Sequence, residues 1–180
     1  KIKNKIIYGL SKIEKEISNK KFEFNQNYED IHINIEKRLF QIIGEEAGYI
    51  HTGRSRNDQV ITDFKIWMRS SIKEINILIN KIIHSTLNLA SKNIDTIMPG
   101  FTHLKNAQPV SFAHYLMAYV EMFERDKKRF NHALNNLDEN PLGVAALTGT
   151  SFNIDRNYTS KKLGFKKPTN NSIDTVSDRD

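Results

Sequence analysis

The sequence predicts an all-α protein built as an elongated bundle of helices. Three observations predict this class. Apolar residues recur at spacings of three and four along most of the 180 residues, no stretch alternates apolar with polar residues as a half-buried strand does, and one helical pattern is too long for a small globular domain. With 38% hydrophobic and 27% charged residues, the chain can bury a core and is unlike a disordered tail.

Two short helices are expected in the first 44 residues. Apolar side chains at helical spacing mark them both: Ile6, Leu10, Ile13 and Ile17 in the first, Ile35, Leu39 and Ile42 in the second. Gly44 is a suitable C-terminal stop for the second helix, because glycine readily adopts the left-handed conformation found there. The stretch from residue 45 to residue 56 breaks the helical pattern and is expected to be a loop.

A much longer helix is expected over residues 57–93. One face carries the apolar residues Ile61, Phe64, Met68, Ile72, Ile75, Ile79 and Ile82, and Val60, Trp67, Leu78 and Ile83 widen it. At ~1.5 Å per residue such a helix is roughly 50 Å long. Its broad apolar face indicates packing on more than one side, as in an elongated bundle.

The rest of the chain is predicted as one loop, one long helix and a shorter one. Pro99 and Gly100 favour a loop over residues 91–109, and the helical spacing then returns over 110–137. A segment of small residues follows, and Asp155 can cap a short helix that ends near Gly164.

The composition excludes several classes of protein. The sequence has no cysteine, which excludes a disulfide scaffold, a cysteine-containing zinc site and thiol catalysis. No apolar run approaches the roughly 20 residues that a membrane span needs, and no signal-peptide pattern follows the basic N-terminal residues. We therefore expect no membrane partner.

The net charge of +6 invites a nucleic-acid hypothesis, but its distribution does not favour one. Most of the basic residues are lysines mixed with acids, as over residues 12–16, and this is typical of a solvated surface. No histidine pair or carboxylate cluster has metal-ligand spacing, and no glycine motif for phosphates or dinucleotides is present. We expect no nucleic-acid partner and no metal.

The segment GYIHTGRSRNDQ at residues 48–59 is the first candidate site. Arg54 and Arg56 supply planar donors suited to carboxylates, and Ser55 and Asn57 lie beside the free amides at the start of the long helix. These features together predict an anion-binding loop. The alternative is that Ser55 or Asn57 only caps the helix while the arginines pair with surface acids, and the spacing favours neither interpretation.

The segment PGFTHLKNAQP at residues 99–109 is the second candidate site. His103 is suited to acid–base chemistry because its ordinary pKa lies near ~6.5, and Thr102 can donate a hydrogen bond to a carboxylate. A single loop histidine is more often structural than catalytic, and the sequence contains five others, so this segment alone does not decide its role.

Both segments resemble those of a known family. GYIHTGRSRNDQVITD closely resembles the loop that distinguishes argininosuccinate lyases, and PGFTHLKNAQPV resembles the Thr-His motif shared across the fumarase/aspartase superfamily. Three further segments resemble argininosuccinate lyases in the family's order: EDIHINIE at 29–36, PLGVAALTGTSFNIDR at 141–156 and NNSIDTVSDRD at 170–180. The resemblance therefore covers nearly the whole chain.

The resemblance implies a reversible β-elimination that converts argininosuccinate to arginine and fumarate in arginine biosynthesis. It implies a cytoplasmic, cofactor-free homotetramer whose active sites each draw residues from several subunits. By resemblance, Asn57 and Thr102 contact the substrate, Arg54, Ser55 and Arg56 line its pocket, and His103 is an acid–base residue. Arg179 is also implied to lie near the site.

By the same resemblance, the chain is expected to be an incomplete part of a fumarase/aspartase-like bundle. Residues 1–53 would be the end of an N-terminal helical domain with the substrate-binding loop, and residues 54–180 the first part of the central long-helix domain. The family's Ser-Ser-x-Met-Pro loop, which supplies a catalytic serine, is not in the sequence, so the fragment alone should be inactive. Lys105 also replaces a usual glutamine, and Val144-Ala145 replaces a more glycine-rich pair.

Two other functions remain as alternatives. One is a catalytically silent, crystallin-like relative with a structural role, which the retained Asn57, Thr102 and His103 disfavour. The other is a different fumarate-releasing enzyme such as adenylosuccinate lyase, for which the sequence shows no purine-and-phosphate pocket.

Overall fold

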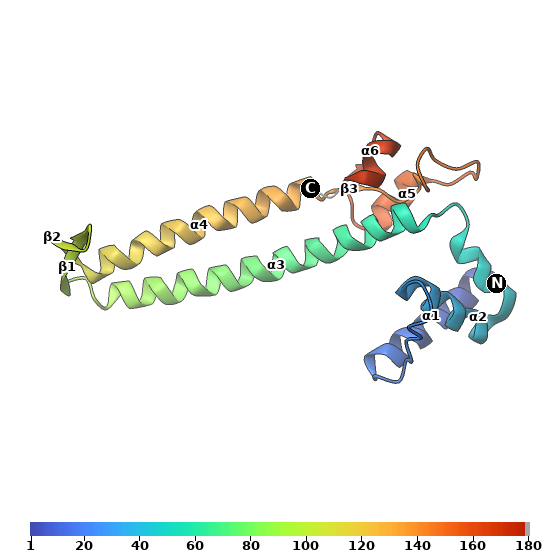
Figure 1. Ribbon diagram of the computed structural model, residues 1–180, viewed down its shortest axis with the longest axis horizontal. Coiled ribbons are helices and arrows are strands. Elements are labelled where there is room, and N and C mark those ends of the chain that lie inside the picture. Colours follow the sequence, from blue (N-terminus) through green and yellow to red (C-terminus); the bar gives the residue numbers. More distant parts are fainter. Residues whose placement is uncertain (179–180) are drawn as a thin grey trace. The chain divides into compact units, whose positions relative to one another are not determined.

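The computed structural model describes residues 1–178 and is mostly helical, which confirms the predicted class (Figure 1). The chain divides into two compact units. The first comprises residues 1–55 together with 150–154, and the second comprises residues 56–149 together with those from 155 onwards. Arg179, implied above to lie near the site, falls outside the described residues.

The first unit packs two α-helices and a 3₁₀-helix. They are α1 (Ile2–Ser18), α2 (Ile31–Ile43) and η1 (Gly44–His51). Ile13, Leu39 and Ala47 form their common core, and Asp30 caps α2 by accepting a hydrogen bond from the Ile33 amide at 2.6 Å. The 3₁₀-helix corrects the expectation of a plain loop after residue 44, because its single buried residue, Ala47, gives too short an apolar pattern to reveal a helix.

The second unit is built on two long helices. α3 (Arg56–Ser91) and α4 (Phe112–Asn136) run side by side in opposite directions (Figure 1). Ile79 and Ile83 of α3 pack against Val120 of α4. The expected bounds of both helices were within two residues of the observed ones, since the apolar period holds along each of them.

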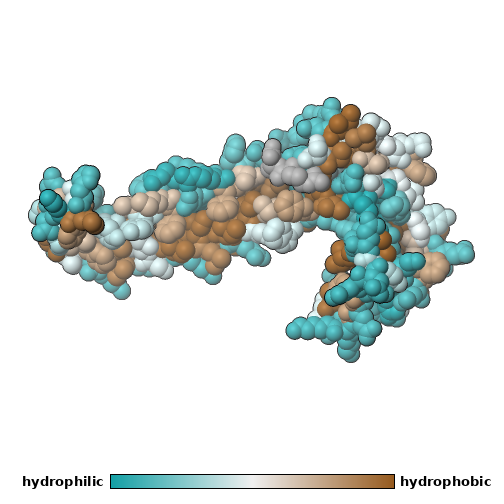
Figure 2. Space-filling view, in the orientation of Figure 1, coloured by the Kyte–Doolittle hydropathy of each residue, from teal (hydrophilic) through white to brown (hydrophobic). Residues whose placement is uncertain are grey.

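Part of the broad apolar face of this helix pair remains exposed. Figure 2 shows apolar residues gathered along it. The exposed large apolar side chains on α3 and α4 include Val60, Phe64, Trp67, Leu78, Ile82, Tyr119 and Met122. Only a part of the apolar width predicted for α3 is therefore used inside the unit.

The segment between the long helices is a β-hairpin, which corrects the prediction of an irregular loop. β1 (Ile97–Thr102) pairs antiparallel with β2 (Lys105–Ser111), and a shift of register lies between Pro99 and Phe101. Side chains on both faces of this hairpin are exposed, so it lacks the alternation of apolar and polar residues by which a half-buried strand is predicted.

The remaining residues form short elements beside the start of α3. They are β3 (Glu139–Asn140), α5 (Arg156–Lys162), β4 (Lys167–Pro168) and α6 (Ser172–Ser177), with β3 and β4 paired in parallel. The Asp155 side chain accepts a hydrogen bond from the Tyr158 amide at 2.9 Å, as expected of the cap of α5. Within residues 1–178, no helix has the length and apolar character to cross a bilayer.

Candidate active site

Arg54 lies at the end of the first unit and is engaged with an acid of that unit. Its Nη2 atom donates a hydrogen bond to Glu36 Oε1 at 2.9 Å, and its side chain is 16% exposed. Glu36 belongs to α2 and also lies 3.7 Å from His51 Nδ1. For Arg54 this contact favours the alternative of an arginine that pairs with a neighbouring acid and shapes the loop.

Of the next three candidates, Ser55 directly precedes α3, and Arg56 and Asn57 are its first two residues. Ser55 and Arg56 are half-buried, and Asn57 is exposed in the first turn of the helix. Arg56 Nη1 donates to Gln59 Oε1 at 3.2 Å, and Asn57 Nδ2 donates to the carbonyl of Ala146 at 3.1 Å. The positive end of the α3 dipole and the donors of Arg56 and Asn57 thus lie together, an arrangement suited to a carboxylate.

Asp58 is a residue of this region that the sequence analysis missed. It is completely buried, and its Oδ2 atom accepts hydrogen bonds from the amides of Gly143 and Ala145, both at 2.8 Å. An acid in the first turn of a helix is usually a dipole-stabilising surface residue, so its type and position gave no reason to select it. Its partners lie 85 and 87 residues further along the chain, and helical periodicity does not report such contacts.

Arg156 binds the same segment through carbonyl groups. It donates to the carbonyls of Leu142 at 3.3 Å and Asn140 at 3.4 Å, and to the carbonyl of Thr169 at 3.2 Å. Burial lowers the pKa of Arg156 from its ordinary value, and the charge of Asp58 opposes that shift.

Thr102 and His103 lie at the tip of the hairpin, where the two strands are joined by a two-residue turn. Thr102 pairs with Lys105, and the intervening His103 and Leu104 have φ angles of 48° and 62°. Positive φ at both central positions matches the type I′ turn that joins twisted strands, although glycine and asparagine are its preferred residues. Thr102 and His103 are exposed, and Leu104 is 99% exposed.

One chain does not bring the two candidate sites together. The hairpin follows the C-terminal end of α3, whereas Asn57 lies at its N-terminal end (Figure 1). α3 has 36 residues and is therefore about 54 Å long. A common pocket for Asn57 and His103 requires residues from more than one copy of the chain.

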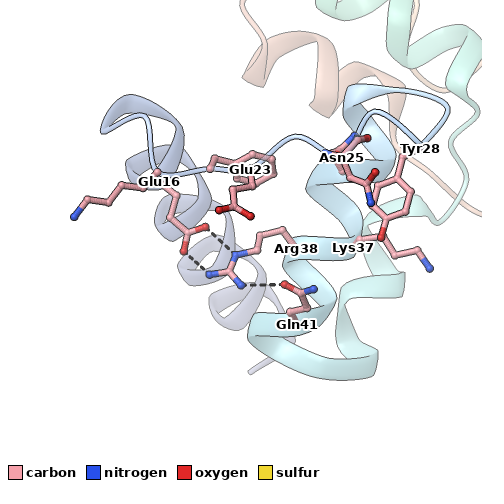
Figure 3. A pocket seen from close by; sticks show the side chains of 10 residues that line it. Glu16, Glu23, Asn25, Tyr28, Lys37, Arg38 and Gln41 are labelled. Atoms are coloured by element: carbon pink, nitrogen blue, oxygen red, sulfur yellow. Dashed lines mark hydrogen bonds and ion pairs between the residues drawn. The ribbon is translucent and has the colours of Figure 1, made fainter.

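A separate hollow of about 490 Å³ lies in the first unit, between α1, α2 and the segment that joins them (Figure 3). Arg38 donates to both carboxylate oxygens of Glu16, at 2.8 Å and 2.6 Å, and Figure 3 shows this pair on its wall. These hydrogen bonds lower the pKa of Glu16 from its ordinary value. None of the candidate residues named above lines this hollow, so it adds nothing to either candidate site.

Among residues 1–178, no group of three or more histidine, aspartate or glutamate side chains is arranged to hold a metal ion. The donors near Asn57 are cationic or neutral groups, which suit an anionic ligand.

The chain belongs to the Lyase family, whose profile matches residues 1–180. Three similar curated proteins are each named argininosuccinate lyase. The one from Pelagibacter ubique (strain HTCC1062) is 77% identical over all 180 residues, and those from Chelativorans sp. (strain BNC1) and Bartonella bacilliformis are 56% and 53% identical over 98% of the chain. The chain spans 39%, 37% and 38% of the length of these relatives.

Solved structures with the same fold support the family assignment. EDDS lyase in complex with formate has a TM-score of 0.84 and 29% identity, and the match covers 96% of this chain and 33% of that protein. A variant of EDDS lyase with bound fumarate has a TM-score of 0.83 and the same identity and coverage. The 3-carboxy-cis,cis-muconate lactonizing enzyme from Pseudomonas putida shares the fold, with a TM-score of 0.64 and 20% identity. This match covers 76% of this chain and 32% of that protein.

Proposed function

We propose that this chain is part of an argininosuccinate lyase, which converts argininosuccinate to arginine and fumarate in arginine biosynthesis. The observation that carries the proposal is the 77% identity to a protein of that name over all 180 residues. EDDS lyase, at 29% identity, is a more distant comparison for the choice of substrate.

The start of α3 supports the proposal because the succinyl group of the substrate carries two carboxylates. Arg56, Asn57 and the first amides of α3 offer positive or donating groups to such a ligand. We assign Ser55, Arg56 and Asn57 to substrate binding, and Arg54 to the shaping of the loop through Glu36.

The chemistry requires removal of a proton next to a carboxylate, which creates a doubly charged aci-carboxylate. Donors fixed in place around that charge stabilise it more than a single proton transfer does. Such a reaction needs no cofactor. We assign an acid–base role to His103 and a substrate contact to Thr102, both of which are accessible at the hairpin tip.

We further propose a homotetramer with active sites shared between subunits. The length of α3 separates Asn57 from His103 and so supports active sites shared between subunits. The exposed apolar side chains of α3 and α4 support association of the long helices (Figure 2). In this assembly residues 1–53 end an N-terminal domain and residues 54–180 begin the central domain. The enzyme is proposed to act in the cytoplasm, on a small-molecule substrate.

The test is a substrate comparison with the full-length protein. Release of fumarate from argininosuccinate, followed by its ultraviolet absorbance, is the expected result. Turnover of adenylosuccinate alone would replace the proposal with the adenylosuccinate lyase alternative. Turnover of neither, by a folded tetramer, would favour the silent crystallin-like relative.

A further inference from the structure

The buried carboxylate of Asp58 has no part in the proposed chemistry, yet it is tied to the segment that contacts Asn57. Its Oδ2 atom accepts the amides of Gly143 and Ala145 at 2.8 Å each. Hydrogen bonds to an ionised acceptor are roughly twice as strong as those between neutral groups. The acceptor of these two hydrogen bonds, Asp58, is completely buried. The segment after residue 142 is therefore held firmly against the first turn of α3.

Arg156 also holds the same segment. The Arg156 guanidinium donates hydrogen bonds to the carbonyls of Asn140 and Leu142. The Asp58 carboxylate accepts hydrogen bonds from the amides of the following residues, beginning with Gly143. Amide groups bound by an anion and carbonyl groups bound by a cation leave the backbone little freedom to rotate.

The backbone of this segment needs such support. Gly143 has a φ of 99° and Ala145 a φ of 55°, in the left-handed region. For alanine this conformation costs about 1–2 kcal/mol, so Ala145 is held there by its surroundings. The next residue is Ala146, whose carbonyl accepts a hydrogen bond from Asn57 Nδ2 at 3.1 Å.

We propose that Asp58 is a positioning residue that sets the orientation of the Asn57 carboxamide through the backbone of Gly143, Ala145 and Ala146. An amide side chain can turn by half a rotation and exchange its donor nitrogen for its acceptor oxygen. The Ala146 carbonyl accepts only a donor, so it selects one of the two orientations. The inference rests on the proposed function, in that Asn57 contacts the substrate.

A double-mutant cycle in the full-length protein tests this coupling. Asp58→Asn is made alone and together with Asn57→Ala, and Glu74→Gln, which neutralises an exposed carboxylate on the same helix, is the control. We expect Asp58→Asn to lower kcat/KM for argininosuccinate by about 5- to 100-fold in the parent protein, mainly through KM, because coupling between linked residues usually has this size. In the Asn57→Ala background the same change should have little further effect.

Thermal unfolding separates positioning from stability. Asp58→Asn should lower Tm by the same amount in both backgrounds, because its hydrogen bonds to Gly143 and Ala145 do not involve the Asn57 side chain. If Asp58→Asn does not fold, Arg156→Lys replaces it in the cycle, since lysine keeps the charge but cannot bind the several carbonyls together. An equal fold-loss of kcat/KM in both backgrounds would overturn the proposal.

Failure of this inference is distinguishable from failure of the proposed function. If the parent protein cleaves argininosuccinate and Asn57→Ala keeps full kcat/KM, the positioning role is rejected while the lyase activity stands. If the parent protein does not cleave argininosuccinate, the crystal structure of the Asp58→Asn protein decides. A displaced or rotated Asn57 carboxamide supports the inference, and an unchanged contact with Ala146 overturns it.

Discussion

The two candidate regions of the second unit are built in opposite ways. At the start of α3, the buried Asp58 and the half-buried Arg156 hold the backbone of the segment next to Asn57. At the hairpin tip, every residue from Phe101 to Pro109 is exposed, and the turn itself has positive φ angles at two non-glycine residues. The first region has its geometry fixed within the chain, whereas the second presents its side chains outward.

Under the proposed function, this difference corresponds to a division of work between the ends of one long helix. A carboxylate is bound best by donors that do not reorganise, and Asp58 and Arg156 hold the backbone beside the start of α3 in place. An acid–base group at an exposed tip acquires a dry, shaped environment only when another surface covers it. The expected outcomes below separate the two regions, from the largest effect to the smallest.

The largest expected effect is the complete absence of turnover by the 180-residue chain alone. Its two candidate regions lie at opposite ends of α3, and the serine loop expected from the family resemblance is not in the sequence. Fumarate release from argininosuccinate is measured for the chain and for the full-length protein at equal concentration. Measurable turnover by the chain would show that the loop is dispensable.

His103→Asn in the full-length protein should lower kcat by about 10²–10⁴-fold, the usual contribution of a positioned acid–base group. The same change should leave Tm unaltered, because the side chain is exposed at the hairpin tip. His84→Asn, at another exposed histidine of the second unit, is the matched control. An undiminished rate in the His103 variant would remove this residue from the mechanism.

Asp58→Asn should lower the free energy of unfolding by about 2–3 kcal/mol, because it replaces the ionised acceptor of two amides with a neutral one. Denaturant unfolding measures this effect. Leu104→Ser, at the 99% exposed tip, should change the unfolding free energy by less than about 0.5 kcal/mol. Equal losses in the two variants would contradict the contrast between the regions.

Ala145→Gly has the smallest expected effect, a gain of up to about 1 kcal/mol in unfolding free energy. Glycine relieves the cost of a φ of 55°, and the greater freedom of the unfolded chain offsets part of that gain. Denaturant unfolding beside Ala146→Gly, whose φ is not positive, isolates the conformational contribution. A clear loss of stability in Ala145→Gly would show that the methyl group matters more than the strain.

The long helices and the caps could be predicted from sequence because they depend on neighbouring residues. The apolar period from Ile61 to Ile82 defined α3, and Asp155 marked the start of α5. The hairpin could not be predicted, because the mostly exposed residues of its two strands show no alternation of apolar and polar side chains. Their sequence therefore looks like that of a loop.

The candidate site could be predicted only in part. The chemical types of Arg56, Asn57 and His103 pointed to anion binding and proton transfer without any structure. The role of Asp58 could not be seen, because its amide partners lie far along the chain and any residue except proline can supply them. The contact of Arg54 with Glu36 agrees with the alternative in which the loop arginines pair with acids, although the sequence did not identify the partner.

The amides bound by Asp58 have a consequence for which substitutions the segment tolerates. The two hydrogen bonds from the amides of residues 143 and 145 to the Asp58 carboxylate impose no demand on the side chains at these positions, apart from excluding proline. Val144, which lies between them, is 1% exposed, so its side chain must fit the surrounding core. Residue type at positions 143 and 145 is therefore limited by their positive φ angles and not by Asp58, so alanine at 145 is tolerated at a modest conformational cost.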